Sequence, residues 1–114
     1  MESILTSVKK ALGIEDSYTH FDVDLIMAIN SVLMVLNQLA IGPTEGFRIE
    51  DKTATWTSLL GTRLDLEAVK TYVYLKVRLI FDPPQTGYLV TSMAEQCKEL
   101  EWRLNVQAEG VPTV

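Results

Sequence analysis

The feature that most constrains the fold is the apolar run AVKTYVYLKVRLIF at residues 68–81, which is followed by one aspartate and then by Pro83 and Pro84. Its tyrosine, valine and threonine residues favour strands, so composition alone leaves helix and strand open. The segment over residues 65–81 is nevertheless much longer than a typical strand. Its apolar positions also recur at helical spacing on one face, which comprises Leu66, Val69, Val73 and Ile80.

The charges and the prolines of this segment also favour a helix. Acidic side chains stand at its start and basic side chains near its end, as the helix dipole prefers. Pro83 ends the helix, because a proline pushes the residue before it out of helical geometry and has no N–H to donate. We therefore predict one continuous helix over residues 65–81. The chain then reverses at the prolines, so that the last helix packs back against it.

Residues 22–41 form a second helical pattern, which is apolar around most of its circumference. The stripe that we expect in the core consists of Leu25, Ile29, Val32, Leu36 and Leu39. Met27 and Met34 lie on a second apolar line. Such a helix exposes too much apolar surface on a monomer, so either it lies in the middle of the bundle or neighbouring subunits cover its second side. Its most apolar window, residues 25–41, has 17 residues, fewer than the roughly 20 needed to cross a bilayer.

Two further helices complete a small bundle. We expect a first helix over residues 4–12, closed by Gly13. A last helix is expected over residues 86–104, with an apolar seam that includes Cys97. Thr19 is the expected N-cap of the second helix, because an acidic first turn follows it.

The remaining segments carry no long periodic pattern. Residues 42–64 form an irregular connection, with a short helical turn at residues 56–60. The sequence therefore predicts an all-α fold of four to five helices. We expect one helical domain over residues 1–105 and a flexible C-terminal tail over residues 106–114.

Composition and charge argue against several classes of protein. The 114 residues carry 15 acidic and 10 basic side chains, for a net charge of −5. Because no domain-sized basic surface is present, binding nucleic acid by neutralising its phosphates is not expected. A single cysteine excludes an internal disulfide and fits a reducing interior. No signal peptide is expected, since the N-terminal lysines follow the apolar residues.

The side chains that could support catalysis or bind a metal do not form a recognisable motif. His20 is the single histidine, whereas a zinc site needs about four ligands. A nucleophile pair of Cys97 with His20 is disfavoured, because apolar surroundings raise the pKa of a thiol. The paired carboxylates could serve acid–base catalysis or magnesium, but more often solvate helix starts and turns; they are Asp22, Asp24, Glu50 and Asp51. We expect no cofactor, no metal and no enzymatic activity.

A cluster of aromatic and cationic side chains on the 65–81 helix is the candidate for a contact between subunits, because tyrosine and arginine are enriched at interfaces. The candidate contact residues are Tyr72, Tyr74, Lys76 and Arg78, together with Met27 and Met34 of the second helix. Two alternatives stay open. In the first, the cluster is ordinary helix surface beside the core. In the second, the chain is a small regulatory protein that binds a partner or DNA through one face.

Five segments, in this order, resemble the small head-tail connector proteins of tailed bacteriophages and prophages, also called adaptor or head-completion proteins. The segments are SVKKALGI, FDVDLIMAIN, TATWTSLL, AVKTYVYLKVRLIFDPP and ELEWRL. The similarity covers roughly residues 3–104, which is nearly the whole chain.

This resemblance implies a mainly helical virion subunit that assembles with copies of itself as a ring beneath the portal protein. Such a ring extends the DNA channel at the head-tail interface and docks the next connector, stopper or tail-completion protein. DNA is only passing cargo, no membrane is involved, and assembly takes place in the cytoplasm of the bacterial host. In such connectors a terminal segment often binds the portal, and the candidate residues here are Val106, Val111, Pro112 and Val114.

Overall fold

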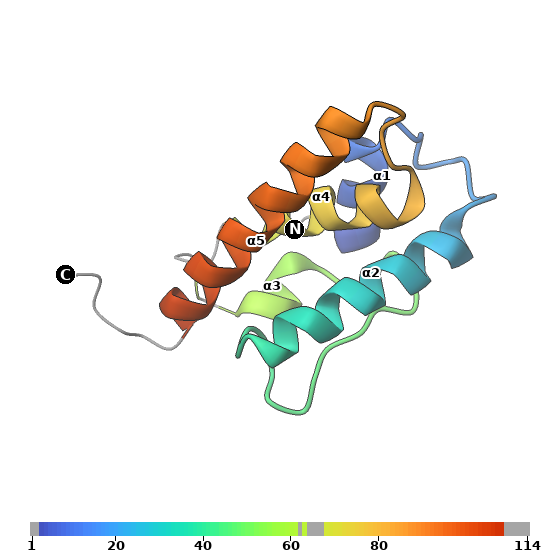
Figure 1. Cartoon of the computed structure of the whole chain (residues 1–114). Helices are drawn as coiled ribbons and strands as arrows, with labels where there is room; N and C mark the ends of the chain where they lie inside the picture. Colours follow the sequence, from blue (N-terminus) through green and yellow to red (C-terminus); the bar gives the residue numbers. More distant parts are fainter. Residues whose placement is uncertain (1–2, 62, 64–67, 109–114) are drawn as a thin grey trace.

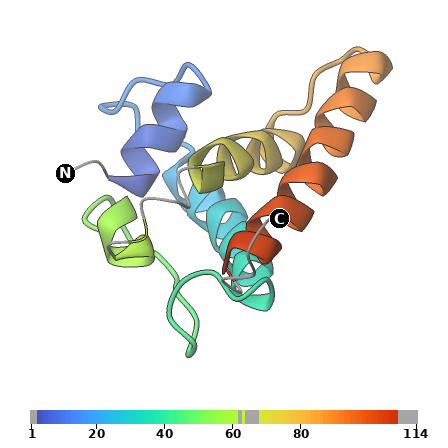
Figure 2. The ribbon, with the colours of Figure 1, turned by 90° about the vertical axis from the view of Figure 1, so that its left-hand side faces the viewer.

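The central helix of the fold is α4, Ala68–Phe81 (Figure 1). It packs against α2, Asp22–Gln38, and against α5, Gly87–Ala108. Two shorter helices, α1 (Ile4–Ala11) and α3 (Trp56–Leu60), lie on the other side of α4 from α5, as Figure 2 shows. The core of the molecule therefore has α4 at its centre, with α2 and α5 as its two main partners.

The computed structural model describes residues 3–61, residue 63 and residues 68–108. These residues form five helices, and extended pairing among them is limited to one isolated bridge between Ser3 and Thr55. The predicted all-α fold is confirmed.

The central helix follows the predicted apolar pattern along most of its length. The helix is confirmed for the described part of the segment, while residues 65–67 lie outside the described residues. Val69, Val73 and Val77 are completely buried. Ile80, predicted on the same core face, is 53% exposed, so this part of the prediction is wrong. The reason is a hollow that separates its side chain from α2 at the last turn of α4.

The second helix buries one side as predicted. The buried residues of this side include Leu25, Ile29, Val32, Leu33 and Leu36. The predicted N-cap is wrong, because α2 begins after Phe21 and no side chain caps it. Thr19 contributes its carbonyl oxygen instead, which accepts a hydrogen bond from the N–H of Asp22 at 3.2 Å.

An ion pair joins α1 to the start of α2. Lys9 is almost completely buried, and its Nζ lies 2.9 Å from Oδ1 of Asp22. The same Nζ donates a hydrogen bond to the carbonyl oxygen of Asp16 at 2.8 Å. A buried ammonium group requires such partners, because removing it from water is costly. Asp22 is therefore part of the framework that holds α1 on α2.

The helices α1 and α2 end with the same backbone motif. In α1 the N–H of Ile14 donates back into the last turn at 2.8 Å, and Gly13 adopts a φ of 76°, as the predicted glycine cap requires. In α2 the N–H of Ile41 donates back at 2.9 Å, and Ala40 has a φ of 67°. An L-residue with a side chain is strained in this left-handed region, so the end of α2 stores a small strain that the end of α1 avoids.

The connection between α2 and α4 contains the predicted short helix, α3. The Thr55 side chain caps it by accepting a hydrogen bond from the N–H of Ser58 at 3.2 Å, and Gly61 ends it with a φ of 61°. Trp56 is buried, and its Nε1–H donates to Oγ of Ser7 in α1 at 3.1 Å. These contacts fix α3 against the first helix.

The last helix is longer than predicted. α5 continues to Ala108, whereas the sequence pattern places its end near residue 104. Asn105 explains part of the difference, because its Nδ2 donates to the carbonyl oxygen of Leu39 at 3.1 Å and holds the end of α5 against the end of α2. Val106, which we expect in the tail, is therefore a helical residue.

Candidate subunit-contact surface

The side of α2 that faces away from the core carries large exposed apolar side chains. Val23, Met27 and Met34 are 71%, 67% and 61% exposed. Ser31 lies on the same line, because residues spaced by four, eight and eleven positions share one side of a helix. We call these four residues the outer face of α2. A soluble monomer rarely gathers exposed apolar side chains in this way unless they contact another molecule.

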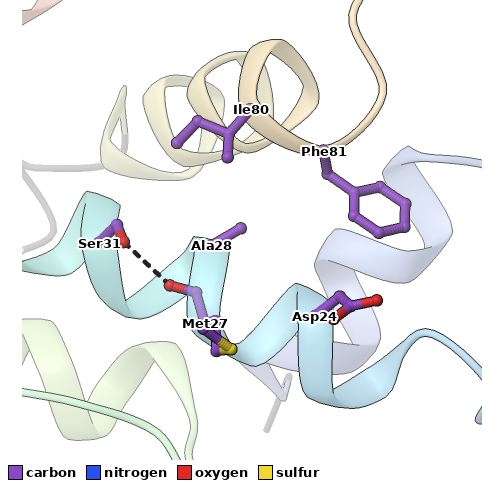
Figure 3. Close-up of a pocket in the computed structure, with 6 residues that line it drawn as sticks. All are labelled: Asp24, Met27, Ala28, Ser31, Ile80 and Phe81. Carbon is purple, nitrogen blue, oxygen red and sulfur yellow. Dashed lines mark hydrogen bonds between the residues drawn. The ribbon is translucent and has the colours of Figure 1, made fainter.

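A first hollow, of about 470 Å³, lies between this outer face and the end of α4 (Figure 3). Figure 3 shows Ile80 and Phe81 reaching from α4 toward α2, with Ile80 on the side of Ala28 and Phe81 on the side of Asp24. Phe81 is held by an edge contact with Phe21, with the ring centroids 5.4 Å apart. The hydrogen bond drawn in Figure 3 runs from Oγ of Ser31 to the carbonyl oxygen of Met27, at 3.1 Å.

A second hollow, of about 790 Å³, adjoins the first and shares Met27 and Ser31 with it. Met34 and Phe47 supply further apolar lining, and Glu45 and Arg48 also line this hollow. The far wall of the hollow thus belongs to the connection that follows α2.

Two asparagines fix this wall to α2. Asn30 exchanges two hydrogen bonds with the backbone of Ile49: its Oδ1 accepts from the N–H at 2.7 Å, and its Nδ2 donates to the carbonyl oxygen at 3.0 Å. Asn37 donates from Nδ2 to the carbonyl oxygen of Pro43 at 3.0 Å. The second hollow is therefore a preformed part of the subunit, which lowers the entropic cost of binding.

The lining of both hollows suits binding better than chemistry. Of the described residues that line them, Asp24, Glu45 and Arg48 carry charge, and the others are apolar or neutral. In the described part of the chain, no three His, Cys, Asp or Glu side chains gather as a metal site would require. Methionine adapts its shape to a partner, which suits a contact surface.

The structure does not place the four candidate residues of α4 on one surface. Tyr72 is 0% exposed, so its side chain packs in the core of the subunit and is not available at the surface of this chain. Tyr74 is half-buried and packs edge-on against Trp56, with the ring centroids 6.1 Å apart. Lys76 is partly exposed, and Arg78 is exposed. The two methionines of α2 are both mostly exposed.

Tyr72 is the buried member of a polar cluster between α4 and α5, whose other members, Lys76 and Glu101, are partly exposed. Its hydroxyl donates to Oε2 of Glu101 at 2.7 Å, and Nζ of Lys76 lies 3.6 Å from the same oxygen. Burial raises the pKa of Tyr72 well above its usual range, and the hydrogen bond to Glu101 raises it further. The hydroxyl therefore stays protonated and holds α4 to α5.

The surroundings of Cys97, His20 and Asp51, which were considered for catalysis, are structural or exposed. Cys97 is buried, and burial raises the pKa of its thiol, which disfavours the thiolate that a nucleophile needs. His20 is exposed, with its ring 4.9 Å from that of Phe21. Asp51 accepts hydrogen bonds from the N–H and the hydroxyl of Thr53, which lower its pKa, so this carboxylate organises a turn.

Sequence reasoning missed two exposed aromatic residues on α5. Tyr88 is 80% exposed and Trp102 is 68% exposed. The signal that could have found them is their spacing of fourteen positions, which places both on one side of the helix, opposite the seam of Cys97 and Leu104. We call Tyr88 and Trp102 the outer face of α5.

The candidate portal-docking residues are only partly within the described chain. Val106 is half-buried in α5 and lines a hollow of about 470 Å³ with Ala68 and Leu104. The other three candidates, Val111, Pro112 and Val114, lie outside the described residues. None of the helices in the described ranges has the length and apolar content that a membrane span requires.

Comparison with known proteins agrees with the resemblance seen in the sequence. No curated protein and no solved structure matches the chain. The model of one family, described as phage connector protein, matches residues 4–111, which includes all five helices. The resemblance to phage head-tail connectors is thereby confirmed, and the chain belongs to the phage connector protein family.

Proposed function

We propose that this phage connector forms a ring of identical subunits beneath the portal protein, where it extends the DNA channel and docks the next connector or tail component. Its place is then at the head-tail interface of the virion, after assembly in the host cytoplasm. The observation that carries the proposal is the outer face of α2, where Val23, Met27 and Met34 are each more than half exposed. The opposite side of the same helix is completely buried, so the subunit has no further use for these side chains.

A neighbouring subunit would gain free energy by covering this surface. Complete burial of a side chain the size of valine or methionine contributes about 1.5–3 kcal/mol. Part of this gain offsets the loss of rotational and translational freedom on association. In a closed ring the same interface repeats between every pair of neighbours, so modest pairwise affinity suffices once the platform brings the copies together.

The charge of the subunit supports a role in which DNA passes without being held. The chain carries a net charge of −5, which repels the phosphate backbone. A salt-dependent gel shift at submicromolar protein would instead favour a DNA-binding regulator. We propose that DNA is cargo for the ring and that the portal, the next connector and other copies of the chain are its partners.

We also propose that the C-terminal residues contact the portal. Val106 and Gln107 belong to α5, and the carbonyl oxygen of Gln107 accepts a hydrogen bond from Nη2 of Arg63 at 2.9 Å. Truncation after Ala108 therefore removes Val111, Pro112 and Val114 while keeping this contact. The truncated chain is expected to fold and to lose portal binding. Full attachment by a folded truncated chain would reject the docking role.

The ring is tested by negative-stain imaging of the purified protein mixed with its portal. We expect rings on the portal with the natural chain and their loss with Met27→Glu, which introduces a charge into the contact surface. Thr57→Glu is the matched control, because it adds the same charge at an exposed position of α3. Rings that survive Met27→Glu as well as they survive Thr57→Glu would contradict a subunit contact at the outer face of α2.

A further inference from the structure

We propose that the ring is closed by two different surfaces of the chain: the outer face of α5, centred on Trp102, docks into the second hollow beside Met34 of the neighbouring copy. This inference rests on the proposed ring and names the surfaces that meet in it. A contact between unlike surfaces leaves each copy with one free surface of each kind, so it propagates from subunit to subunit and closes as a ring.

The first step is that α5 has an apolar side which the subunit itself does not cover. Trp102 is 68% exposed, although a tryptophan normally buries most of its large ring. Cys97 and Leu104, on the opposite side of α5, are completely or almost completely buried against the core. Core packing thus orients α5 so that Trp102 is turned outward.

The second step is the arrangement of the two outer faces. The helices α2 and α5 both pack against α4, and each presents its buried side to the shared core (Figures 1 and 2). Their outer faces are therefore turned away from that core. Trp102 can meet the hollow beside Met34 only when the two belong to different copies of the chain.

The third step is chemical fit. The second hollow has a volume of about 790 Å³ and is lined by the thioethers of Met27 and Met34 and by Phe47. Sulfur–aromatic and aromatic–aromatic contacts suit an incoming indole ring. The indole N–H needs an acceptor once it is removed from water, and the carboxylate of Glu45 lies on the lining of this hollow.

The fourth step is charge complementarity. Trp102 is followed in the chain by Arg103, which is 63% exposed and lies 2.9 Å from the 61% exposed carboxylate of Glu99. The hollow likewise carries one acid and one base, Glu45 and Arg48. Arg103 can therefore pair with Glu45, and Glu99 with Arg48. Such pairing lets two acidic subunits approach at a locally neutral site and disfavours partners without the complementary pattern.

The contact is tested by cysteine cross-linking in the full chain. The two cysteines are introduced by Gln38→Cys and Lys98→Cys. Gln38 lies one turn beyond Met34, Lys98 lies one turn before Trp102, and both residues are exposed. The natural Cys97 is buried, so the unmodified chain is the blank. The double variant carries both substitutions in one chain. When it is assembled on the portal and treated with a short bismaleimide, it should give a ladder of covalent oligomers. A mixture of the two single variants should stop at dimers.

A second variant pair tests the charges without disturbing the apolar centre. Glu45→Arg and Arg103→Glu should each weaken self-association at least about tenfold, and their combination should restore most of it. If rings form but give no cross-linked ladder, and if the charge-reversal variants do not change their formation, the assigned surfaces are wrong although the ring itself exists. The absence of any oligomer, with or without the portal, would remove the ring itself and this contact with it.

Discussion

The two sides of α2 show how one helix serves both folding and assembly. Its inner side, which includes Leu25, Ile29 and Leu36, is completely buried against the rest of the subunit. Its outer side carries Met27 and Met34, both mostly exposed and both beside preformed hollows. The inner side is rich in branched side chains with few rotamers, whereas the outer side has adaptable methionines. Folding of the monomer thus requires only the side chains of the inner side.

The largest effect should come from a cavity on the inner side. Ile29→Ala removes buried methyl and methylene groups, so the free energy of unfolding should fall by about 2–5 kcal/mol. Met27→Ala, two residues earlier on the outer side, should change it by no more than about 0.5 kcal/mol. Urea unfolding of the two variants measures the difference. Equal losses would show that Met27 is part of the core.

A smaller loss of stability is expected from a substitution of Asn30, which lies between the inner and outer sides of α2. Asn30→Ala leaves the N–H and carbonyl groups of the buried Ile49 without their partners, at 2.7 and 3.0 Å in the native chain. The free energy of unfolding should fall by about 1–3 kcal/mol. Because the same hydrogen bonds hold the wall of the second hollow, self-association should weaken as well. Ser31→Ala, at the next and exposed position, is the control for stability alone. An equally large loss in the free energy of unfolding with Ser31→Ala would contradict the role of Asn30.

The buried tyrosine of α4, Tyr72, should make the stability of the fold depend on alkaline pH. The pKa of Tyr72 is raised in the folded state, so the unfolded chain loses this proton first once the pH exceeds about 10. Stability is therefore complete below that pH and falls as the pH rises toward the folded pKa.

Tyr72→Phe should cost about 1 kcal/mol at neutral pH through the lost hydrogen bond to Glu101, and should flatten the alkaline decline. Tyr88→Phe, at an 80% exposed position, is the control and should not lower stability at neutral pH. Thermal unfolding between pH 7 and pH 11 follows both variants. An unchanged alkaline slope in Tyr72→Phe would contradict the raised pKa of the buried Tyr72 hydroxyl.

The smallest effect should be a gain. Ala40→Gly relieves the left-handed strain at the end of α2, where φ is 67°, and should stabilise the fold by about 0.5–1 kcal/mol. It touches neither side of the helix, so ring formation should stay unchanged. Urea unfolding and imaging together check this separation. A destabilised Ala40→Gly variant would show that the strain is compensated elsewhere.

The helices were predictable from sequence because their signals are local. The apolar spacing of Val69 and Val73, the glycine cap at Gly13 and the stop before Pro83 each act within a few residues. The inner side of α2 follows the same rule. The all-α fold is the sum of such local preferences.

The candidate site was less predictable because it depends on distant partners. The sequence predicts Tyr72 as an interface residue, yet its hydroxyl donates a hydrogen bond to Glu101, 29 positions away. Ile80 fits the core pattern of α4 but meets a hollow. In the sequence Trp102 stands close to the apolar seam of α5, and only the packing of α5 shows that it faces outward. Periodicity predicts which residues share a face, and tertiary packing decides which face is buried.

The outer face of α2 is tested most directly by methionine oxidation. Free and portal-assembled protein would be treated with dilute peroxide, and sulfoxide formation at Met27 and Met34 followed by mass spectrometry. In the free subunit both residues should oxidise quickly, since they are 67% and 61% exposed. Assembly into the ring should slow both at least about tenfold. Equal oxidation rates in the free subunit and in the assembled ring would contradict the account.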